Sequence, residues 1–242
     1  MLIRSTWDYT ARRDEYVAWA ESVGERLHNP PAVIRWNSDK RYLRDLVDAG
    51  LPVVPTTFLQ PGDEVGEIDV PCVVKPAVSA GSQNTASHRD AGEAAAHAQA
   101  LLDLGHVVMV QPYIAEIDTE GETALLYYDG VYDHAIRKAA ILTNGPADVH
   151  GLFAPESIEE REARPEEREL GDRVVAEVER RFGRLLYTRV DLVGTVPQVL
   201  ELELTEPSLF FRQSDGAAAR YAAAIRARGR RGPSSGAASA QP

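Results

Sequence analysis

The sequence feature that most constrains this chain is an acidic hairpin pattern between Leu185 and Ser208, LLYTRVDLVGTVPQVLELELTEPS. β-Branched and apolar residues on both sides of Gly194-Thr195 predict two antiparallel strands. Asp191 lies on the first strand, and the second strand carries Glu201 and Glu203. Side chains two residues apart on a strand share a face, so these two glutamates are expected to point the same way.

The register of this hairpin decides whether Asp191 joins the glutamates. A strict two-residue turn would place Asp191 opposite Gln198, on the wrong parity for Glu201. A three-residue loop or one bulge would place it opposite Val199 and diagonal to Glu201. Pro197 favours such an irregularity because it has no N–H to donate to a ladder.

Three carboxylates this close repel one another by about 1 kcal/mol per pair in water, and by more in a cleft of lower dielectric. A cation is therefore expected among them, and ligands that are all oxygen favour Mg²⁺ or Mn²⁺ over zinc. The same pattern also fits a half-exposed strand with leucines inside and glutamates in solvent. The hairpin alone does not decide between these two interpretations.

The composition narrows the class of protein. No apolar run approaches the about 20 residues that span a bilayer, and the N-terminus lacks a signal-peptide pattern, so we expect a cytoplasmic protein without a membrane partner. One cysteine, Cys72, excludes a disulfide framework. A net charge of −11 argues against a nucleic-acid partner.

Only three of the 26 basic residues are lysines: Lys40, Lys75 and Lys138. A compact ammonium group suits phosphate binding, so each lysine is a candidate for that role. Ser38 is the expected N-cap of a helix that runs through Ala49, which puts Lys40 in the first turn. A cation is unfavourable there unless an anion lies nearby, although a solvated lysine fits the pattern equally well.

Lys75 follows a buried strand predicted over residues 70–74 and precedes a loop of small residues, Ser79–Asn84. Backbone N–H groups in such a loop can cradle a phosphate, with the lysine reaching across to it. The loop lacks the P-loop pattern, and an ordinary surface loop would look the same.

Other segments complete the predicted architecture. Strands are expected over residues 2–6, 53–59, 107–110, 123–128 and 131–142, and helices over residues 16–27, 90–104, 165–182 and 214–226. Asp90 is the expected N-cap of the helix over residues 90–104. Asp129-Gly130 predicts a type I′ hairpin turn, and the adjacent Arg137 and Lys138 should face opposite sides of the returning strand. Residues 144–157 form an irregular loop that could act as a lid.

The order of these segments resembles an ATP-grasp enzyme over about residues 37–211. ELELTEP at residues 201–207 resembles the E-x-N-x-T-x-P metal-binding strand of prokaryotic glutathione synthetases. The wider run RSTWDY, NSDKRYL, VVKPAVSAGS and LELELTEPS is similar to a glutathione-synthetase-like group that includes O-ureido-serine cyclo-ligase. None of the motifs is specific by itself, but six of them occur in the right order.

The resemblance implies an ATP-grasp fold, in which two α+β subdomains clasp ATP. It implies that ATP is contacted by Lys40, Lys75, Ser79, Gly81, Ser82, Gln111, Pro112, Tyr113, Ile114 and Glu122. Adenine would meet residues 111–114, and the ribose would meet Glu122, with Glu116 and Asp118 as alternatives. Mg²⁺ or Mn²⁺ would be held by Asp191, Glu201 and Glu203. The implied catalytic residues are Lys75 and Arg137, and Arg137 would steady either the transferring phosphoryl group or the acyl phosphate.

The reaction implied is ATP-dependent ligation of a small-molecule carboxylate to an amine or similar nucleophile through an acylphosphate. Two alternatives stay open: an ATP-binding module without ligase activity, and a structural domain that binds no nucleotide. The sequence does not name the substrates or decide whether the chain forms a homodimer.

Two departures from the family pattern bear on this prediction. Glu203 stands where the family usually has Asn, which adds negative charge at the metal site. ATP-grasp ligases also carry an N-terminal α/β domain before the first lysine, so we expect residues 1–36 to be a remnant of it. We expect the ATP-grasp domain over residues 37–226, with a small subdomain at about 52–112, and a disordered tail over 227–242.

Overall fold

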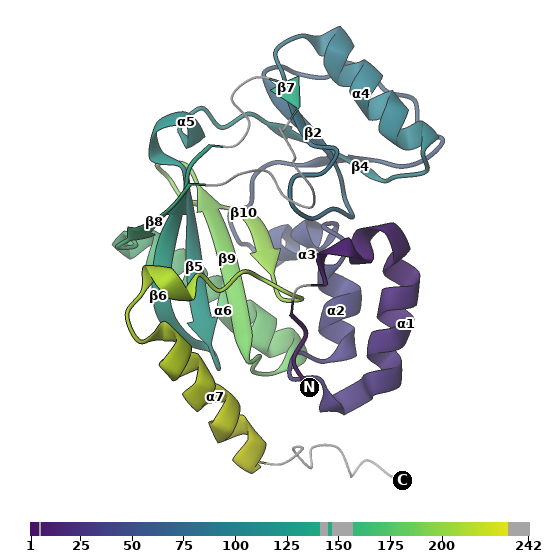
Figure 1. Cartoon of the computed structure of the whole chain (residues 1–242). Coiled ribbons are helices and arrows are strands. Elements are labelled where there is room, and N and C mark those ends of the chain that lie inside the picture. The colour runs from purple at the N-terminus through teal and green to yellow at the C-terminus, as the bar shows by residue number, and fades with distance from the viewer. Residues whose placement is uncertain (5, 141–144, 147–156, 232–242) are drawn as a thin grey trace.

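Two antiparallel sheets organise the chain, one above the other in Figure 1. The structure is a computed structural model that describes residues 1–4, 6–140, 145–146 and 157–231. Most of the loop expected to act as a lid, and residues 232–242 of the expected tail, lie outside the described residues.

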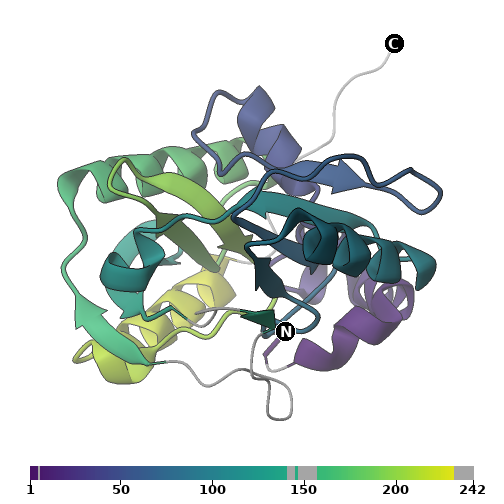
Figure 2. The same ribbon diagram turned by 90° about the horizontal axis from the view of Figure 1, so that it is seen from above.

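The smaller sheet has the strand order β1-β4-β2-β3-β7. Its strands are β1 (Thr57–Leu59), β4 (Val108–Pro112), β2 (Cys72–Pro76), β3 (Ala86–His88) and β7 (Gly145–Pro146). Helix α4 (Ala91–Asp103) lies alongside these strands (Figure 2) and buries Ala94, Ala98, Leu101 and Leu102 against them. The expected N-cap is confirmed, because the Asp90 carboxylate accepts a hydrogen bond from the N–H of Glu93.

The larger sheet has the order β10-β9-β5-β6-β8. Its strands are β10 (Gln198–Glu203), β9 (Tyr187–Val193), β5 (Glu122–Tyr128), β6 (Val131–Lys138) and β8 (Ile158–Arg161). The turn between β5 and β6 is the predicted one, with Asp129 at φ 50° and Gly130 at φ 74°. Two positive φ values are what a type I′ turn requires.

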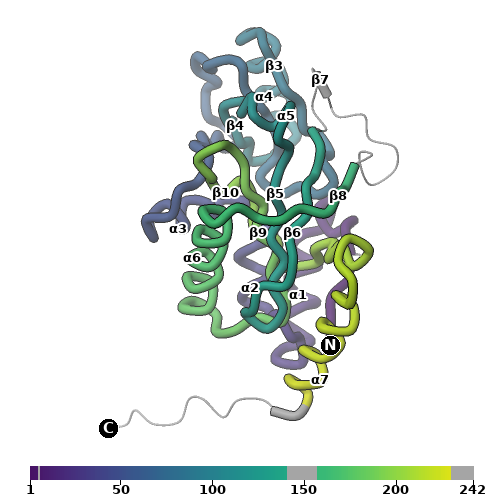
Figure 3. Tube along the Cα trace, turned by 90° about the vertical axis from the view of Figure 1, so that its left-hand side faces the viewer, coloured from purple at the N-terminus to yellow at the C-terminus, as the bar shows by residue number. Residues whose placement is uncertain are grey.

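Helices cover both faces of the larger sheet (Figure 3). Helix α6 (Pro165–Phe182), predicted with the same bounds, packs against the face that holds Leu125 and Tyr127. Helix α7 (Ala217–Arg231) packs its Tyr221 against the face that holds Leu126 and Tyr128. Successive side chains of β5 point alternately into these two cores. Residues paired with β5 on the neighbouring strands point to the same face as their partners.

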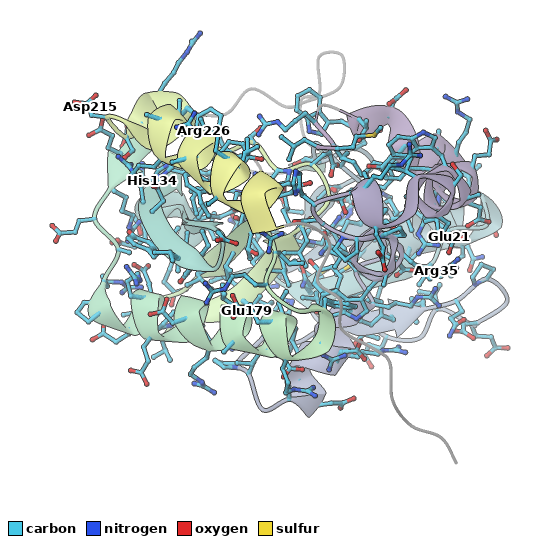
Figure 4. All side chains as sticks on the ribbon, turned by 90° about the horizontal axis from the view of Figure 1, so that it is seen from below. Glu21, Arg35, His134, Glu179, Asp215 and Arg226 are labelled. Carbon is cyan, nitrogen blue, oxygen red and sulfur yellow. The ribbon has the colours of Figure 1, made fainter. Side chains whose placement is uncertain are left out.

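The N-terminal region is helical and lies beside the larger sheet (Figure 1). It contains 3₁₀ turns η1 (Trp7–Arg12) and η2 (Gly24–Arg26) and the helices α1 (Arg13–Val23), α2 (Pro31–Asn37) and α3 (Tyr42–Asp48). Glu21 of α1 and Arg35 of α2 form an ion pair that joins the first two helices (Figure 4). The remaining elements of the described residues are the short helix α5 (Ile117–Glu120) and the 3₁₀ turn η3 (Phe211–Gln213).

Three sequence expectations about secondary structure are wrong. Residues 2–4 and 6, the described part of the expected first strand, belong to no strand. Ser38 ends α2 instead of starting a helix, and the next helix begins at Tyr42. The Ser38 hydroxyl accepts a hydrogen bond from Arg13 Nε at 2.9 Å instead of capping that helix. Helix α7 continues to Arg231, so residues 227–231 of the expected tail are helical.

None of the helices in the described part of the chain is long and apolar enough to cross a membrane.

Candidate active site

A cavity of about 210 Å³ lies where the two sheets meet, and both sheets contribute to its lining. The smaller sheet and its loops supply Lys75, Ser79, Gly81, Ser82, Gln111, Pro112, Tyr113 and Ile114. The larger sheet supplies Glu122, Lys138, Arg189, Glu201 and Glu203. The ATP contacts implied by the sequence thus all line one cavity, Lys40 included.

The β9–β10 hairpin brings the acidic residues together more closely than expected. Four residues, 194–197, connect the strands, and the register shifts between Val199 and Glu201. The bulge occurs, but it places Asp191 directly opposite Glu201, whereas Val199 pairs with Leu192. The expected diagonal arrangement is therefore wrong in detail, and the two carboxylates are cross-strand neighbours.

Lys40 connects the acidic strand to the small-residue loop. Its Nζ atom lies 3.1 Å from Glu201 Oε1 and donates to the Ser79 carbonyl oxygen at 2.7 Å. Its backbone N–H donates to the carbonyl of Ala77 at 2.9 Å, which ties the segment between α2 and α3 to the end of β2. Lys40 therefore lies where it can meet an anion held by the loop.

Lys75 is buried at the floor of the cavity. Burial lowers the pKa of its ammonium group, and the nearby Lys40 acts in the same direction while Glu201 opposes it. The charged form of Lys75 is therefore only partly stabilised by its surroundings, and an anion bound next to it would stabilise it further.

Lys138 and Arg189 neutralise Asp191 from two sides. Lys138 Nζ lies 2.8 Å from Asp191 Oδ2 and 2.6 Å from Glu122 Oε2. Arg189 donates to both oxygens of Asp191, at 2.8 and 2.9 Å, and also pairs with Glu203. Burial opposes ionisation of Asp191, but Arg189 and Lys138 outweigh it and lower its pKa to about 2.

Glu203 has the opposite balance. Burial and the neighbouring carboxylates of Asp191 and Glu201 raise its pKa to about 8, although Arg189 opposes the shift. Of the three carboxylates on this face, Glu203 is the one whose negative charge its surroundings stabilise least.

Whether a divalent cation fits can be judged from these donors. Asp191, Glu201 and Glu203 lie on one face, and the raised pKa of Glu203 indicates that a further cation would be favourable there. Their oxygens are turned toward Lys40, Lys138 and Arg189, and over the described ranges no three acidic, histidine or cysteine side chains are already arranged to ligate a metal. The residue types fit Mg²⁺, provided that the ammonium groups release the carboxylates.

Arg137 does not line this cavity. Its guanidinium donates to the carbonyls of Glu120 at 2.8 Å and Thr119 at 2.9 Å, and lies 3.4 Å from Glu159. The neighbouring residue Lys138 faces the cavity instead, as the alternation along β6 requires once Arg137 points the other way.

Sequence reasoning missed several residues that the fold brings to the cavity, namely Arg189, Glu206, Trp7 and Tyr9. Ser208 and Phe210 also line it, and they belong to a segment, residues 208–211, that is apolar enough in sequence to pack or to line a pocket. A signal existed for Arg189, which lies two residues before Asp191 and so shares its face. Glu206, Ser208 and Phe210 follow β10 in an irregular segment, where no periodicity indicates which way a side chain points.

Comparison with known proteins finds relatives along almost the whole chain. Residues 1–29 match the family model described as D-cycloserine synthetase DcsG, N-terminal domain. The cycloserine biosynthesis protein DcsG of Streptomyces lavendulae is 36% identical, with 93% of this chain and 81% of that protein covered.

Solved structures agree with this relationship. The crystal structure of D-cycloserine synthetase DcsG matches with a TM-score of 0.83 and 35% identity, over 94% of this chain and 82% of that one. A D-alanine–D-alanine ligase from Bacillus anthracis complexed with ATP matches with a TM-score of 0.60 and 18% identity, over 84% and 71%. The ATP-grasp ligase PsnB, complexed with a minimal precursor, gives 0.56 and 23%, over 85% and 66%. The last two show a shared fold only.

Proposed function

This chain belongs to the D-cycloserine synthetase family of ATP-grasp ligases, which are ATP-dependent enzymes that form C–N bonds, and we propose that it joins a carboxylate to a nitrogen nucleophile through an acylphosphate. The observation that carries the proposal is the arrangement of charges in the cavity. Lys40 and Lys75 belong to the side that includes the Ser79–Ser82 loop, and they face the carboxylates of Glu201 and Glu203 on β10. Asp191 of β9 lies buried behind them, next to Glu201, and does not itself line the cavity.

ATP is proposed to bind between these two walls. The backbone of residues 111–114 and the apolar side chains of Val73, Ile117 and Leu200 suit a flat adenine ring, and Glu122 is the proposed acceptor for the ribose hydroxyls. The triphosphate would then reach Lys40, Lys75 and the Ser79–Ser82 loop.

Phosphate oxygens would compete with carboxylates for the same ammonium groups. Lys40 is paired with Glu201, and Lys138 with Asp191, so the arrival of the triphosphate would release both carboxylates. Asp191, Glu201 and Glu203 would then hold Mg²⁺. When bound, this ion supplies charge neutralisation at the phosphates.

The chemistry proceeds in two steps. A substrate carboxylate oxygen attacks the γ-phosphorus, the bond from that phosphorus to the bridging oxygen of ADP breaks, and an acylphosphate forms. A nitrogen lone pair then attacks the acyl carbon, inorganic phosphate leaves with the former carboxylate oxygen, and the nitrogen loses a proton. Lys75, Lys138 and Arg189 contribute positive charge where negative charge develops, which is the main catalytic task in phosphoryl transfer.

The name of the relative indicates D-cycloserine as the first product to test, and the resemblance to O-ureido-serine cyclo-ligase makes O-ureido-D-serine the substrate to test. Ring closure on the nitrogen that is bonded to oxygen then also requires water to remove the carbamoyl group from that nitrogen, as CO₂ and ammonia. The purified chain is incubated with ATP, Mg²⁺ and this substrate, and ADP, phosphate and D-cycloserine are measured. Substrate-dependent release of ADP together with D-cycloserine supports the full proposal, and release of ADP with another amide product changes only the substrate. Binding of a non-hydrolysable ATP analogue without any substrate-dependent ADP would overturn the ligase proposal.

A further inference from the structure

The cavity contains one carboxylate that none of the proposed contacts uses, that of Glu206. The residue lines the cavity, yet it is only 7% exposed. Over the described part of the chain, no lysine, arginine or histidine nitrogen lies within 4.0 Å of it. A buried carboxylate without a cationic partner is costly, and a cationic ligand would reduce that cost.

The surroundings of Glu206 differ from the part of the cavity assigned to ATP. Trp7 donates its indole N–H to the backbone carbonyl of Glu206 at 3.3 Å, and Tyr9 lies near enough for the Glu206 carboxylate to help raise the pKa of its phenol. Trp7 and Tyr9 also line the cavity, together with Ser208 and Phe210. This end of the cavity, which we call the Glu206 pocket, is therefore formed by the N-terminal segment and the segment after β10.

Arg189 connects the Glu206 pocket to the catalytic centre. It holds Asp191, donates to the carbonyl of Ser208 at 3.4 Å, and places its guanidinium carbon 5.4 Å from the centre of the Phe210 ring. The positive charges of Lys40 and Arg189 act on Glu206, but burial prevails and raises its pKa to about 7. A small cation that carries hydrogen-bond donors would be stabilised next to the Glu206 carboxylate.

The kind of cation follows from the geometry. The nitrogen groups of Lys40 and Arg189 already hold Glu201, Asp191 and Glu203, so a chain residue does not supply it. A single carboxylate beside aromatic side chains suits an ammonium group, which needs one anionic acceptor and tolerates ring faces. A molecule that carries this ammonium close to a carboxylate would place the carboxylate toward Arg189 and the site of phosphoryl transfer.

We propose that Glu206 binds the α-ammonium group of an amino-acid substrate and thereby directs the carboxylate of the same molecule to the catalytic centre. This inference rests on the proposed function, because it identifies the Glu206 pocket as the acceptor side of that site. It makes Glu206 a residue that determines specificity, and Trp7 and Tyr9 the walls that exclude water from the contact.

The test compares two ligands that differ only in the ammonium group: O-ureido-D-serine and 3-(ureidooxy)propanoate, in which hydrogen replaces it. Their binding to the full chain is measured by calorimetry in the presence of Mg²⁺ and a non-hydrolysable ATP analogue, so no turnover is needed. The variants are E206Q, which keeps the shape and removes the charge, and E206D, which keeps the charge. E166Q, at an exposed position of α6, is the matched control.

We expect E206Q to weaken binding of O-ureido-D-serine by a factor of about 10 to 100, as expected when a charge-assisted hydrogen bond is lost. Binding of 3-(ureidooxy)propanoate and of the ATP analogue should change little, E206D should retain a preference for the ammonium-bearing ligand, and E166Q should match the wild type. Equal losses for both ligands, no loss for either, or a wild-type chain that binds the nucleotide but neither ligand would overturn the inference. ADP release, measured separately with ATP, reports on the proposed function, so the two can fail independently.

Discussion

Lys138 on β6 pairs with Asp191 on β9 at 2.8 Å, although strand β5 lies between these two strands. Ala124 of β5 is the cross-strand neighbour of Asp191, and its methyl group leaves room for the lysine side chain to cross. One ammonium group thereby joins three strands of the larger sheet, because it also pairs with Glu122 of β5. The distribution of charge in the cavity therefore depends on the contacts of Lys138 with Asp191 and Glu122.

The first prediction separates Lys138 from its neighbour Arg137. K138Q should reduce substrate-dependent ADP release by about a hundredfold or more, because it removes a cation that faces the developing charge. R137Q should retain most of the activity, since the Arg137 guanidinium is bound to the carbonyls of Thr119 and Glu120. A coupled assay for ADP measures both, and a larger loss in R137Q than in K138Q would refute this assignment.

The second prediction concerns stability at low pH. The folded state holds the pKa of Asp191 at about 2, below its ordinary value of 3.8, so the carboxylate stabilises the fold above pH 3.8. This contribution should be lost as the pH falls from 3.8 to about 2. D191N should lack that part of the pH dependence and lose about 3–5 kcal/mol at pH 7, because Arg189 and Lys138 stay buried with one carboxylate fewer between them. Urea unfolding at several pH values tests both statements.

The third prediction has the opposite sign. Because the pKa of Glu203 is about 8 in the folded chain against an ordinary 4.5, the folded state holds its proton longer than the unfolded state does. The free energy of unfolding should therefore decrease as the pH rises from 4.5 to 8 in the absence of Mg²⁺.

E203Q should show a shallower decrease over that pH range and melt about 2–4 °C above the wild type at pH 8.5 for each kcal/mol recovered. Glu206, whose pKa is about 7, keeps part of the slope in the variant. Addition of Mg²⁺ with an ATP analogue should narrow the difference. Identical melting curves for E203Q and wild type at pH 8.5 would show that the Glu203 carboxylate is not strained by its neighbours.

The fourth prediction tests the phosphate side of the cavity. K40M should weaken binding of a non-hydrolysable ATP analogue by a factor of about 10 to 100, because an ammonium group that contacts phosphate is removed. R41Q is the control, because Arg41 lies in the same segment between α2 and α3 but does not line the cavity. Its guanidinium is paired with Asp39 instead. Calorimetry that finds equal affinity for K40M and wild type would exclude Lys40 from the nucleotide site.

The fifth prediction concerns Gly121, which directly precedes β5 and has a φ of 69°. A Cβ atom at this position would overlap the carbonyl oxygen of Lys138 and crowd the Arg137 side chain at 3.2 Å. Gly183, at φ 74°, has nothing within 4 Å of its Cβ position. Both glycines combine a positive φ with ψ near 180°, at −166° for Gly121 and 178° for Gly183, a region that essentially only glycine adopts. Both Gly→Ala variants should therefore lose about 1–3 kcal/mol, and G121A should lose a further 1–3 kcal/mol from the overlap. Equal losses by urea unfolding would mean that the backbone around Lys138 relaxes freely.

Local patterns in the sequence were sufficient where neighbours along the chain decide the structure. The bounds of α6, the Asp90 cap of α4 and the type I′ turn at Asp129-Gly130 depend on capping, periodicity and positive φ, which involve only a few consecutive residues. Ser38 shows the limit of this reasoning. Serine is a good N-cap residue, but the Ser38 hydroxyl accepts a hydrogen bond from Arg13, 25 residues earlier in the chain.

The sequence by itself determined the residue types of the site: an acidic hairpin, lysines beside a small-residue loop, and Arg137 and Lys138 on opposite faces of one strand. Only the tertiary structure decided which of these faces meets the cavity, because that choice follows from which side of β5 packs against α6. It also decided that a bulge after Val199 sets Asp191 opposite Glu201. Glu206 was hidden for the same physical reason, since the direction of a side chain in an irregular segment is set by what packs around it and not by the residues next to it.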